Sequence, residues 1–88
     1  MSFKGIYMYK NRASSGRNNL CGEKVKKYRL ALAEKTSQRR LADMLQLAGL
    51  DVDKNVIQKI ESGERFVTDI ELKIIAQVLN VRYEDLLD

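Results

Sequence analysis

The residues with the clearest capacity for chemistry are polar side chains in the segment KNVIQKIESG, residues 54–63. Val56, Ile57 and Ile60 recur with the period of a helix and form an apolar stripe. The opposite face of that helix collects hydrogen-bonding groups: Lys54, Asn55, Gln58 and Lys59. Lysine can donate to guanine O6 and N7, and asparagine can pair bidentately with adenine, so this face suits the edges of DNA base pairs. The alternative is an amphipathic helix whose outer face is only solvated.

Two short helices joined by a turn must position these side chains. Asp53 is a good N-cap for the second helix, and Gly63 can end it because glycine readily adopts positive φ. The first of the two helices begins at the capping signal Thr36-Ser37-Gln38 and ends at Gly49. Its expected apolar positions are Leu41, Met44, Leu45 and Ala48.

Arg39 and Arg40 fall in the first turn of that first helix. The helix dipole is positive at this end, so each cation there costs roughly 0.3 kcal/mol or more unless an anion lies nearby. A DNA phosphate would be such an anion. We therefore predict that both arginines contact the DNA backbone.

Three further helices complete the expected fold. One precedes the pair and runs from about residue 22 to 34, one runs from the capping box Thr68–Glu71 to Asn80, and residues 81–87 form a short last helix. The expected inward positions are Val25, Tyr28 and Leu32 on the first helix and Leu72, Ile75, Ala76 and Leu79 on the fourth.

Length and composition limit the class of protein. Eighty-eight residues, of which 44% are hydrophobic and none is proline, favour one all-α domain with a modest core. The chain has no histidine, no G-x-S-x-G motif and no glycine-rich phosphate loop, so we expect no enzyme. A single cysteine, Cys21, favours a buried thiol and argues against a disulfide, a metal site or a cofactor. No apolar run of about 18 residues occurs, so we expect a soluble cytoplasmic protein with no membrane partner.

Basic residues concentrate toward the N-terminus. Residues 1–40 carry 11 Lys and Arg against two Asp and Glu, whereas residues 41–88 carry five against ten, so the two parts have net charges of +9 and −5. With this charge distribution, a polyanion would be attracted to the N-terminal part of the chain. We expect residues 1–20 to be a flexible basic arm, able to lie along a minor groove, or else a leader with no role. Residues 21–88 are the expected folded domain.

The order of residues in the two central helices resembles the lambda-repressor and Cro-like (XRE-type) helix-turn-helix family. The matching positions are Ser37-Gln38, Leu41-Ala42, Ile57, Ile60-Glu61 and Gly63. The link QLAGLDVD is several residues longer than is usual in that family. The resemblance implies a five-helix bundle that acts as a sequence-specific transcriptional regulator, a repressor, of bacterial or phage type. Its third helix would enter the major groove and its second would lie across the backbone.

The resemblance also implies roles for individual residues. Lys54, Asn55 and Lys59 would be the main base readers and Gln58 a secondary one. The phosphate contacts would be Gln38, Arg39, Arg40 and Arg65. Arg29 and Glu61 would form a structural ion pair.

The expected partners are double-stranded DNA and a second copy of the chain. The last helix carries Tyr83, Leu86 and Leu87, more apolar surface than a small domain need bury, so we predict a homodimer on DNA through this helix. The alternative function is a protein-interaction module of the same fold, such as the antitoxin of a toxin–antitoxin pair.

Overall fold

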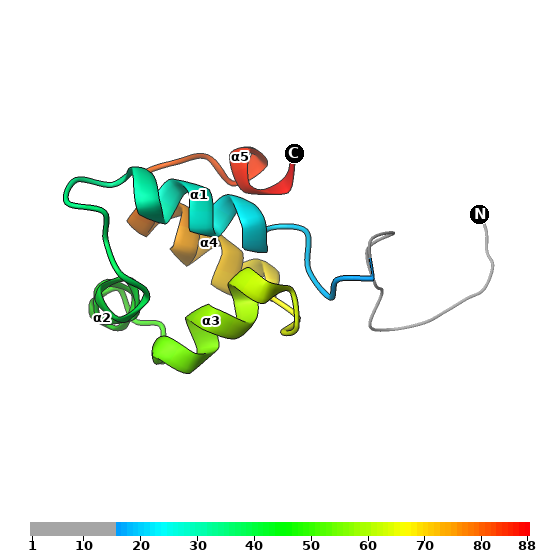
Figure 1. Ribbon diagram of the computed structural model, residues 1–88, viewed down its shortest axis with the longest axis horizontal. Coiled ribbons are helices and arrows are strands. Elements are labelled where there is room, and N and C mark those ends of the chain that lie inside the picture. Colours follow the sequence, from blue (N-terminus) through cyan, green and yellow to red (C-terminus); the bar gives the residue numbers. More distant parts are fainter. Residues whose placement is uncertain (1–15) are drawn as a thin grey trace.

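Five α-helices make up the regular structure of residues 16–88, the part of the chain that the computed structural model describes (Figure 1). They are α1 (Gly22–Ala31), α2 (Gln38–Leu47), α3 (Lys54–Ser62), α4 (Asp69–Leu79) and α5 (Tyr83–Leu87). No strand occurs within residues 16–88. The predicted all-α, five-helix architecture is therefore confirmed.

Side-chain caps start α2, α3 and α4 at the predicted residues. Ser37 and Asp53 each accept a hydrogen bond from the backbone N–H three residues later, at 3.0 and 2.9 Å. Thr68 begins α4 with a complete capping box. Each cap satisfies a backbone donor that the helix itself leaves unpaired. At the other end of α3, Gly63 has a φ of +86°, in the left-handed region that favours glycine.

α1 is shorter than the sequence predicted, because it ends at Ala31 and not at Glu34. Glu34 and Lys35 have positive φ values of 68° and 50°, so the backbone turns sharply after the helix. The turn places the Thr36 carbonyl 2.8 Å from Arg29 Nη1. This bond joins residues seven positions apart and holds the turn that ends α1, so helix signals between neighbouring residues do not reveal it.

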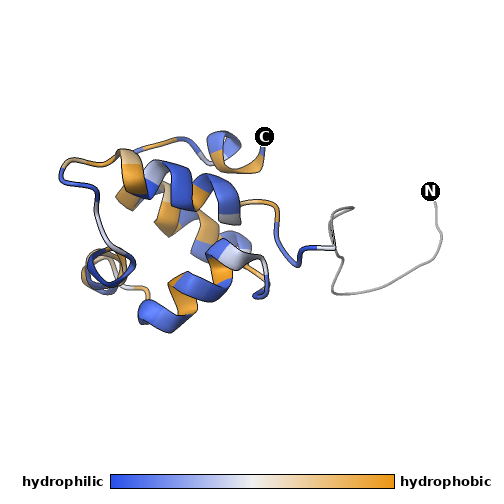
Figure 2. Ribbon diagram, in the orientation of Figure 1, coloured by the Kyte–Doolittle hydropathy of each residue, from blue (hydrophilic) through white to orange (hydrophobic). Residues whose placement is uncertain are grey.

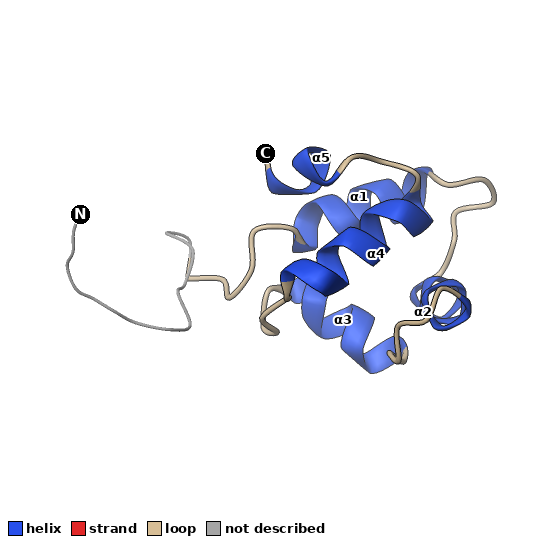
Figure 3. Cartoon of the chain, turned by 180° about the vertical axis from the view of Figure 1, so that it is seen from behind, coloured by secondary structure: helices blue, strands red, loops and turns tan. Residues whose placement is uncertain are grey.

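α1 occupies the middle of the bundle and packs against α3, α4 and α5. α2 packs against α3 and α4. Views from the front and from behind both place α2 and α3 together, on the side of the molecule away from α5 (Figures 1 and 3). Consequently α3 has one side against the bundle and the other facing outward.

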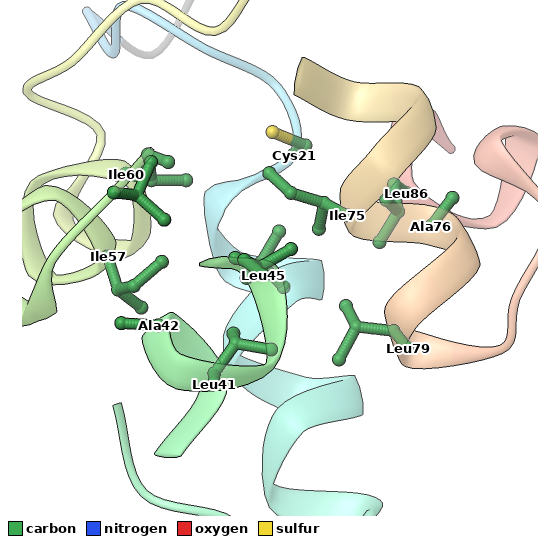
Figure 4. Close-up of a cluster of buried hydrophobic side chains, with 12 residues drawn as sticks. Cys21, Leu41, Ala42, Leu45, Ile57, Ile60, Ile75, Ala76, Leu79 and Leu86 are labelled. Atoms are coloured by element: carbon green, nitrogen blue, oxygen red, sulfur yellow. The ribbon is translucent and has the colours of Figure 1, made fainter. Parts of the chain in front are cut away.

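All five helices contribute side chains to one apolar core (Figure 4). Hydrophobic and hydrophilic residues interleave along α1 and α3, as amphipathic helices require (Figure 2). Burying each large aliphatic side chain contributes about 1.5–3 kcal/mol. The buried hydrophobic residues of the helices are Val25, Leu41, Ala42, Leu45, Ile57, Ile60, Ile75, Ala76, Leu79 and Leu86.

Two apolar residues differ from their expected positions. Ala48 is exposed, because α2 ends at Leu47 and Ala48 lies in the turn that follows. Leu86 is completely buried, so it belongs to the core of its own chain and cannot form a dimer surface. Tyr83 and Leu87 remain about half exposed.

Cys21 is buried at the start of α1, as predicted for a free thiol. Burial raises the pKa of this thiol to about 11. The side chain is therefore protonated near neutral pH and behaves as a small apolar group.

Within residues 16–88, no three His, Cys, Asp or Glu side chains gather in a way that could hold a metal ion. None of the described helices combines the length and apolarity needed to cross a membrane.

Candidate nucleic-acid interface

The outward side of α3 presents four exposed side chains: Lys54, Asn55, Gln58 and Lys59. They are the predicted base readers. Within residues 16–88, none of these side chains has a hydrogen bond or an ion pair. The opposite side of the helix is fixed in the core by Ile57 and Ile60. The polar groups are therefore held on a fixed helix, and their donors and acceptors are available to a ligand.

Arg39, in the first turn of α2, lies near the start of α3. Arg39 and Lys54 line one open depression of about 300 Å³ between the two helices. The other residues that line it are Ala42, Asp43, Gln46 and Asp53. The structure thus brings a predicted phosphate contact together with a predicted base reader. Asp43 adds an exposed negative charge to the same surface.

Arg40 lies on another side of α2. It lines a separate depression with residues of the α1–α2 turn, among them Leu32 and Glu34. Like Arg39, it is exposed and makes no side-chain ion pair within residues 16–88. The two neighbouring arginines therefore face different parts of the surface.

Gln38 and Arg65 are bound within the protein itself. Gln38 Nε2 donates to Glu61 Oε1 at 3.0 Å. The Arg65 guanidinium donates two hydrogen bonds to Glu71, at 3.0 and 2.9 Å, and lowers the pKa of that carboxyl group. These two residues thus differ from Arg39 and Arg40, whose side chains have no such partners.

The predicted pair of Arg29 and Glu61 is present and buried. Arg29 Nε donates to Glu61 Oε2 at 2.7 Å, and Nη2 donates to Oε1 at 3.0 Å. With the bond from Arg29 to the carbonyl of Thr36, the pair connects α1, α3 and the approach to α2. Because the pair is buried, loss of either partner would leave an unpaired charge inside the protein. The pair therefore favours the arrangement of helices in which both partners meet.

The sequence pattern of a helix-turn-helix family matches residues 25–86. The chain belongs to the XRE-type helix-turn-helix family. The predicted resemblance is thereby confirmed, and membership makes the chain a DNA-binding transcriptional regulator.

A solved protein structure has a similar fold. The high-resolution crystal structure of the restriction-modification controller protein C.AhdI from Aeromonas hydrophila superposes with a TM-score of 0.62. The two chains are 23% identical, and the match covers 74% of this chain and 84% of that one. At this identity the similarity concerns the fold. A comparison with curated protein sequences gives no match.

Residues 17–19 precede the part matched by the helix-turn-helix pattern, yet they bind the end of α3. The sequence placed them in a basic arm of residues 1–20, so the packed part of the chain begins earlier than Cys21. Of that arm, residues 1–15 lie outside the described residues. The signal that could have revealed the contact is the pair Asn18-Asn19 just before a helix, since asparagine side chains commonly cap helix starts.

Proposed function

We propose that this helix-turn-helix protein is a sequence-specific transcriptional repressor that inserts α3 into the major groove. The observation that carries the proposal is the outward face of α3, with four exposed polar side chains that lack partners in residues 16–88. Lys54 and Asn55 begin the helix, where side chains reach base edges in this architecture. Lys59 would be a further main reader and Gln58 a secondary one.

The proposed contacts to the DNA backbone begin with Arg39 and Arg40. Both are exposed cations at the N-terminal end of α2, where backbone N–H groups also favour an anion. Gln38 and Arg65 are weaker candidates, because Glu61 and Glu71 already take hydrogen bonds from them. A phosphate contact from either residue would use the N–H groups that these carboxylates leave free.

The proposed homodimer uses an apolar groove beside α5. The groove is open, has a volume of about 200 Å³, and is lined by Asn19, Leu20, Cys21, Val67, Leu72 and Leu87. Leu20 is 63% exposed and Leu87 45% exposed, so both offer apolar area to a partner. A second copy related by a two-fold axis would place two α3 helices on half-sites about one DNA turn apart.

The same groove also favours the alternative, a protein-interaction module such as an antitoxin. A foreign protein could cover Leu20 and Leu87 as well as a second copy could. The solved structure with the same fold is a restriction-modification controller protein, and this similarity favours the regulator over the protein-interaction module. Purification of the full chain from its native source separates the two functions: the repressor elutes without a stoichiometric foreign chain.

The direct test is selection of binding sites by the full chain from a pool of random DNA duplexes. The proposal predicts enrichment of one sequence, with two related halves, and affinity that falls steeply as salt rises. Equal recovery of all sequences at every salt concentration would contradict it.

A further inference from the structure

Asn19 joins three backbone segments through one side chain. Its Nδ2 donates to the carbonyl of Ile60 in the last turn of α3 at 3.0 Å, and to the carbonyl of Arg65 at 2.7 Å. Its Oδ1 accepts from the N–H of Gly22, the first residue of α1, at 2.8 Å. The residue is 9% exposed. One buried amide therefore ties the start of α1 to the end of α3.

Arg17 and Asn18 extend this contact along the same helix end. Arg17 Nη2 donates to the carbonyl of Glu61 at 2.7 Å, which puts a cation at the negative end of the α3 dipole. The backbone N–H of Asn18 donates to the carbonyl of Gly63 at 2.8 Å, and its Nδ2 donates to the carbonyl of Glu64 at 2.9 Å. Residues 17–19 thus donate hydrogen bonds to five backbone carbonyls, those of residues 60, 61, 63, 64 and 65.

The close approach of the Arg17 side chain to the end of α3 depends on the glycine at position 63. A Cβ at Gly63 would lie 2.6 Å from Arg17 Cζ, so the arginine side chain crosses directly over this residue. Gly22 likewise lies against the carbonyl of Ile60, where a Cβ would collide. Gly63 therefore serves two purposes, since it also adopts the positive φ that ends the helix.

We propose that residues 17–19 are a positioning segment, which fixes the tilt of α3 and thereby the sequence discrimination of the protein. This inference rests on the proposed function of α3 in the major groove. Asn55 lies eight residues from Gly63, about 12 Å along the helix. A tilt of about 10° at the bound end moves Asn55 by about 2 Å. Direct hydrogen bonds to bases tolerate far less, since donor and acceptor lie roughly 2.7–3.2 Å apart.

The charge of Arg17 is directed at the protein. Its side chain is 24% exposed, Nη2 is bound to the carbonyl of Glu61, and Nη1 lies 3.8 Å from Glu23. Arg39 offers the contrast, because its exposed side chain has no ion pair within residues 16–88. Comparing substitutions of these two arginines therefore separates the loss of helix positioning from the loss of a phosphate contact.

The test compares Arg17→Gln with Arg39→Gln on two duplexes, one selected by the wild-type chain from a random pool and one scrambled. Arg17→Gln is expected to weaken binding to the selected duplex about tenfold and to leave the scrambled duplex and the salt slope unchanged. Arg39→Gln is expected to weaken both and to lower the salt slope by about 0.9. If Arg17→Gln behaves like Arg39→Gln, or keeps wild-type discrimination, the inference is wrong.

A second measurement needs no DNA. The amides of Gly63, Glu64 and Arg65 donate to carbonyls of Lys59 and Ile60 at the bound end of α3. Their hydrogen exchange is expected to become at least fivefold faster in Arg17→Gln, while amides in α4 keep wild-type rates. Asn18→Ala removes one exposed side-chain bond and should fold in any case, with a smaller change at the same amides. Unchanged exchange at residues 63–65 in both variants would overturn the inference.

These measurements also separate the inference from the proposed function. If the wild-type chain selects no sequence, the proposed reader role of α3 fails, and the exchange rates alone then decide whether residues 17–19 hold the helix. If the wild type selects a sequence and the variants discriminate equally well, only the positioning role fails.

Discussion

Glu61 receives hydrogen bonds from three parts of the chain at once. Arg29 from α1 and Gln38 from the start of α2 donate to its carboxylate, and Arg17 donates to its carbonyl. Its side chain is 4% exposed, so its charge is separated from water. A residue bound in this way fixes α3 against its neighbours through specific bonds as well as through apolar packing.

Removal of this carboxylate should destabilise the protein strongly. Glu61→Ala leaves Arg29 buried without its partner, so we expect a loss of roughly 3–5 kcal/mol in the free energy of unfolding, measured in urea. Replacing both residues by apolar ones should cost less than the sum of the single changes. Additive losses below about 0.5 kcal/mol each would mean that the pair is effectively solvated.

The raised pKa of Cys21 predicts a loss of stability at alkaline pH. The pKa of the thiol is about 8.5 in the unfolded chain and about 11 in the folded one. The folded pKa is the higher one, so this contribution to stability is complete below pH ~8.5 and disappears as pH rises toward 11. Urea unfolding from pH 7 to 11 should therefore show a steeper decline for the wild type than for Cys21→Ala. Parallel declines would show that the thiol ionises freely in the folded state.

The helices α2 and α3 have different proposed roles: α2 contacts the DNA backbone, and α3 reads bases. Both begin with a side-chain cap, but neither has an acidic residue in its first turn, where the dipole favours one. α2 has Arg39 and Arg40 there, and α3 has Lys54. The cations at the start of α2 cost folding energy that a bound anion would offset, whereas Lys54 directly follows the capping carboxylate of Asp53.

The two arginines of α2 can be compared directly. Arg39→Ala should weaken binding to all duplexes alike and lower the salt slope by about one unit. Arg40→Ala should have a smaller effect, because Arg40 faces the α1–α2 turn and not the start of α3. Without DNA, each variant should melt at the same temperature as the wild type or slightly higher, since a cation leaves a helix N-terminus. A lower melting temperature for Arg39→Ala would indicate a structural role.

Local sequence signals were sufficient for α2, α3 and α4. Caps at Ser37, Asp53 and Thr68 act within one helical turn, so they can be read from neighbouring residues. The exposed face of α3 could be predicted for the same reason, because helical period alone places Asn55 opposite Ile57.

Contacts between distant residues could not be read in this way. The end of α1 depends on the bond from Arg29 to Thr36, and the binding of Asn19 to Ile60 spans 41 positions. The bonds of Gln38 to Glu61 and of Arg65 to Glu71 likewise depend on how α3 and α4 are placed in the fold. A polar residue that looks free in the sequence can therefore already have a partner in the fold.

For the whole molecule, one surface carries the proposed DNA contacts and another is apolar. The α2–α3 side lies away from α5 (Figure 1). The groove lined by Leu20 and Leu87 includes the last residue of α5. This separation would allow a dimer to form without covering the face of α3.

Assembly can be tested with one change in that groove. Leu87→Glu places a charge at the proposed contact, so sedimentation should show monomer, and protection of DNA should shrink to one half-site. Its control is Leu47→Glu, at the 91% exposed end of α2 and outside the groove, which should assemble like the wild type. A wild-type chain that stays monomeric and protects a single half-site would rule out the dimer.

The reading of bases by α3 is tested most directly by removing the amide of Asn55. Binding of Asn55→Ala and of the wild type is measured on the selected duplex and on a scrambled one, at several salt concentrations. Asn55 is exposed, so the fold should be unaffected. We predict a loss of about 1–3 kcal/mol on the selected duplex, a relaxed preference at one base pair, and no change on the scrambled duplex. An equal loss on both duplexes would contradict the reading of bases by α3.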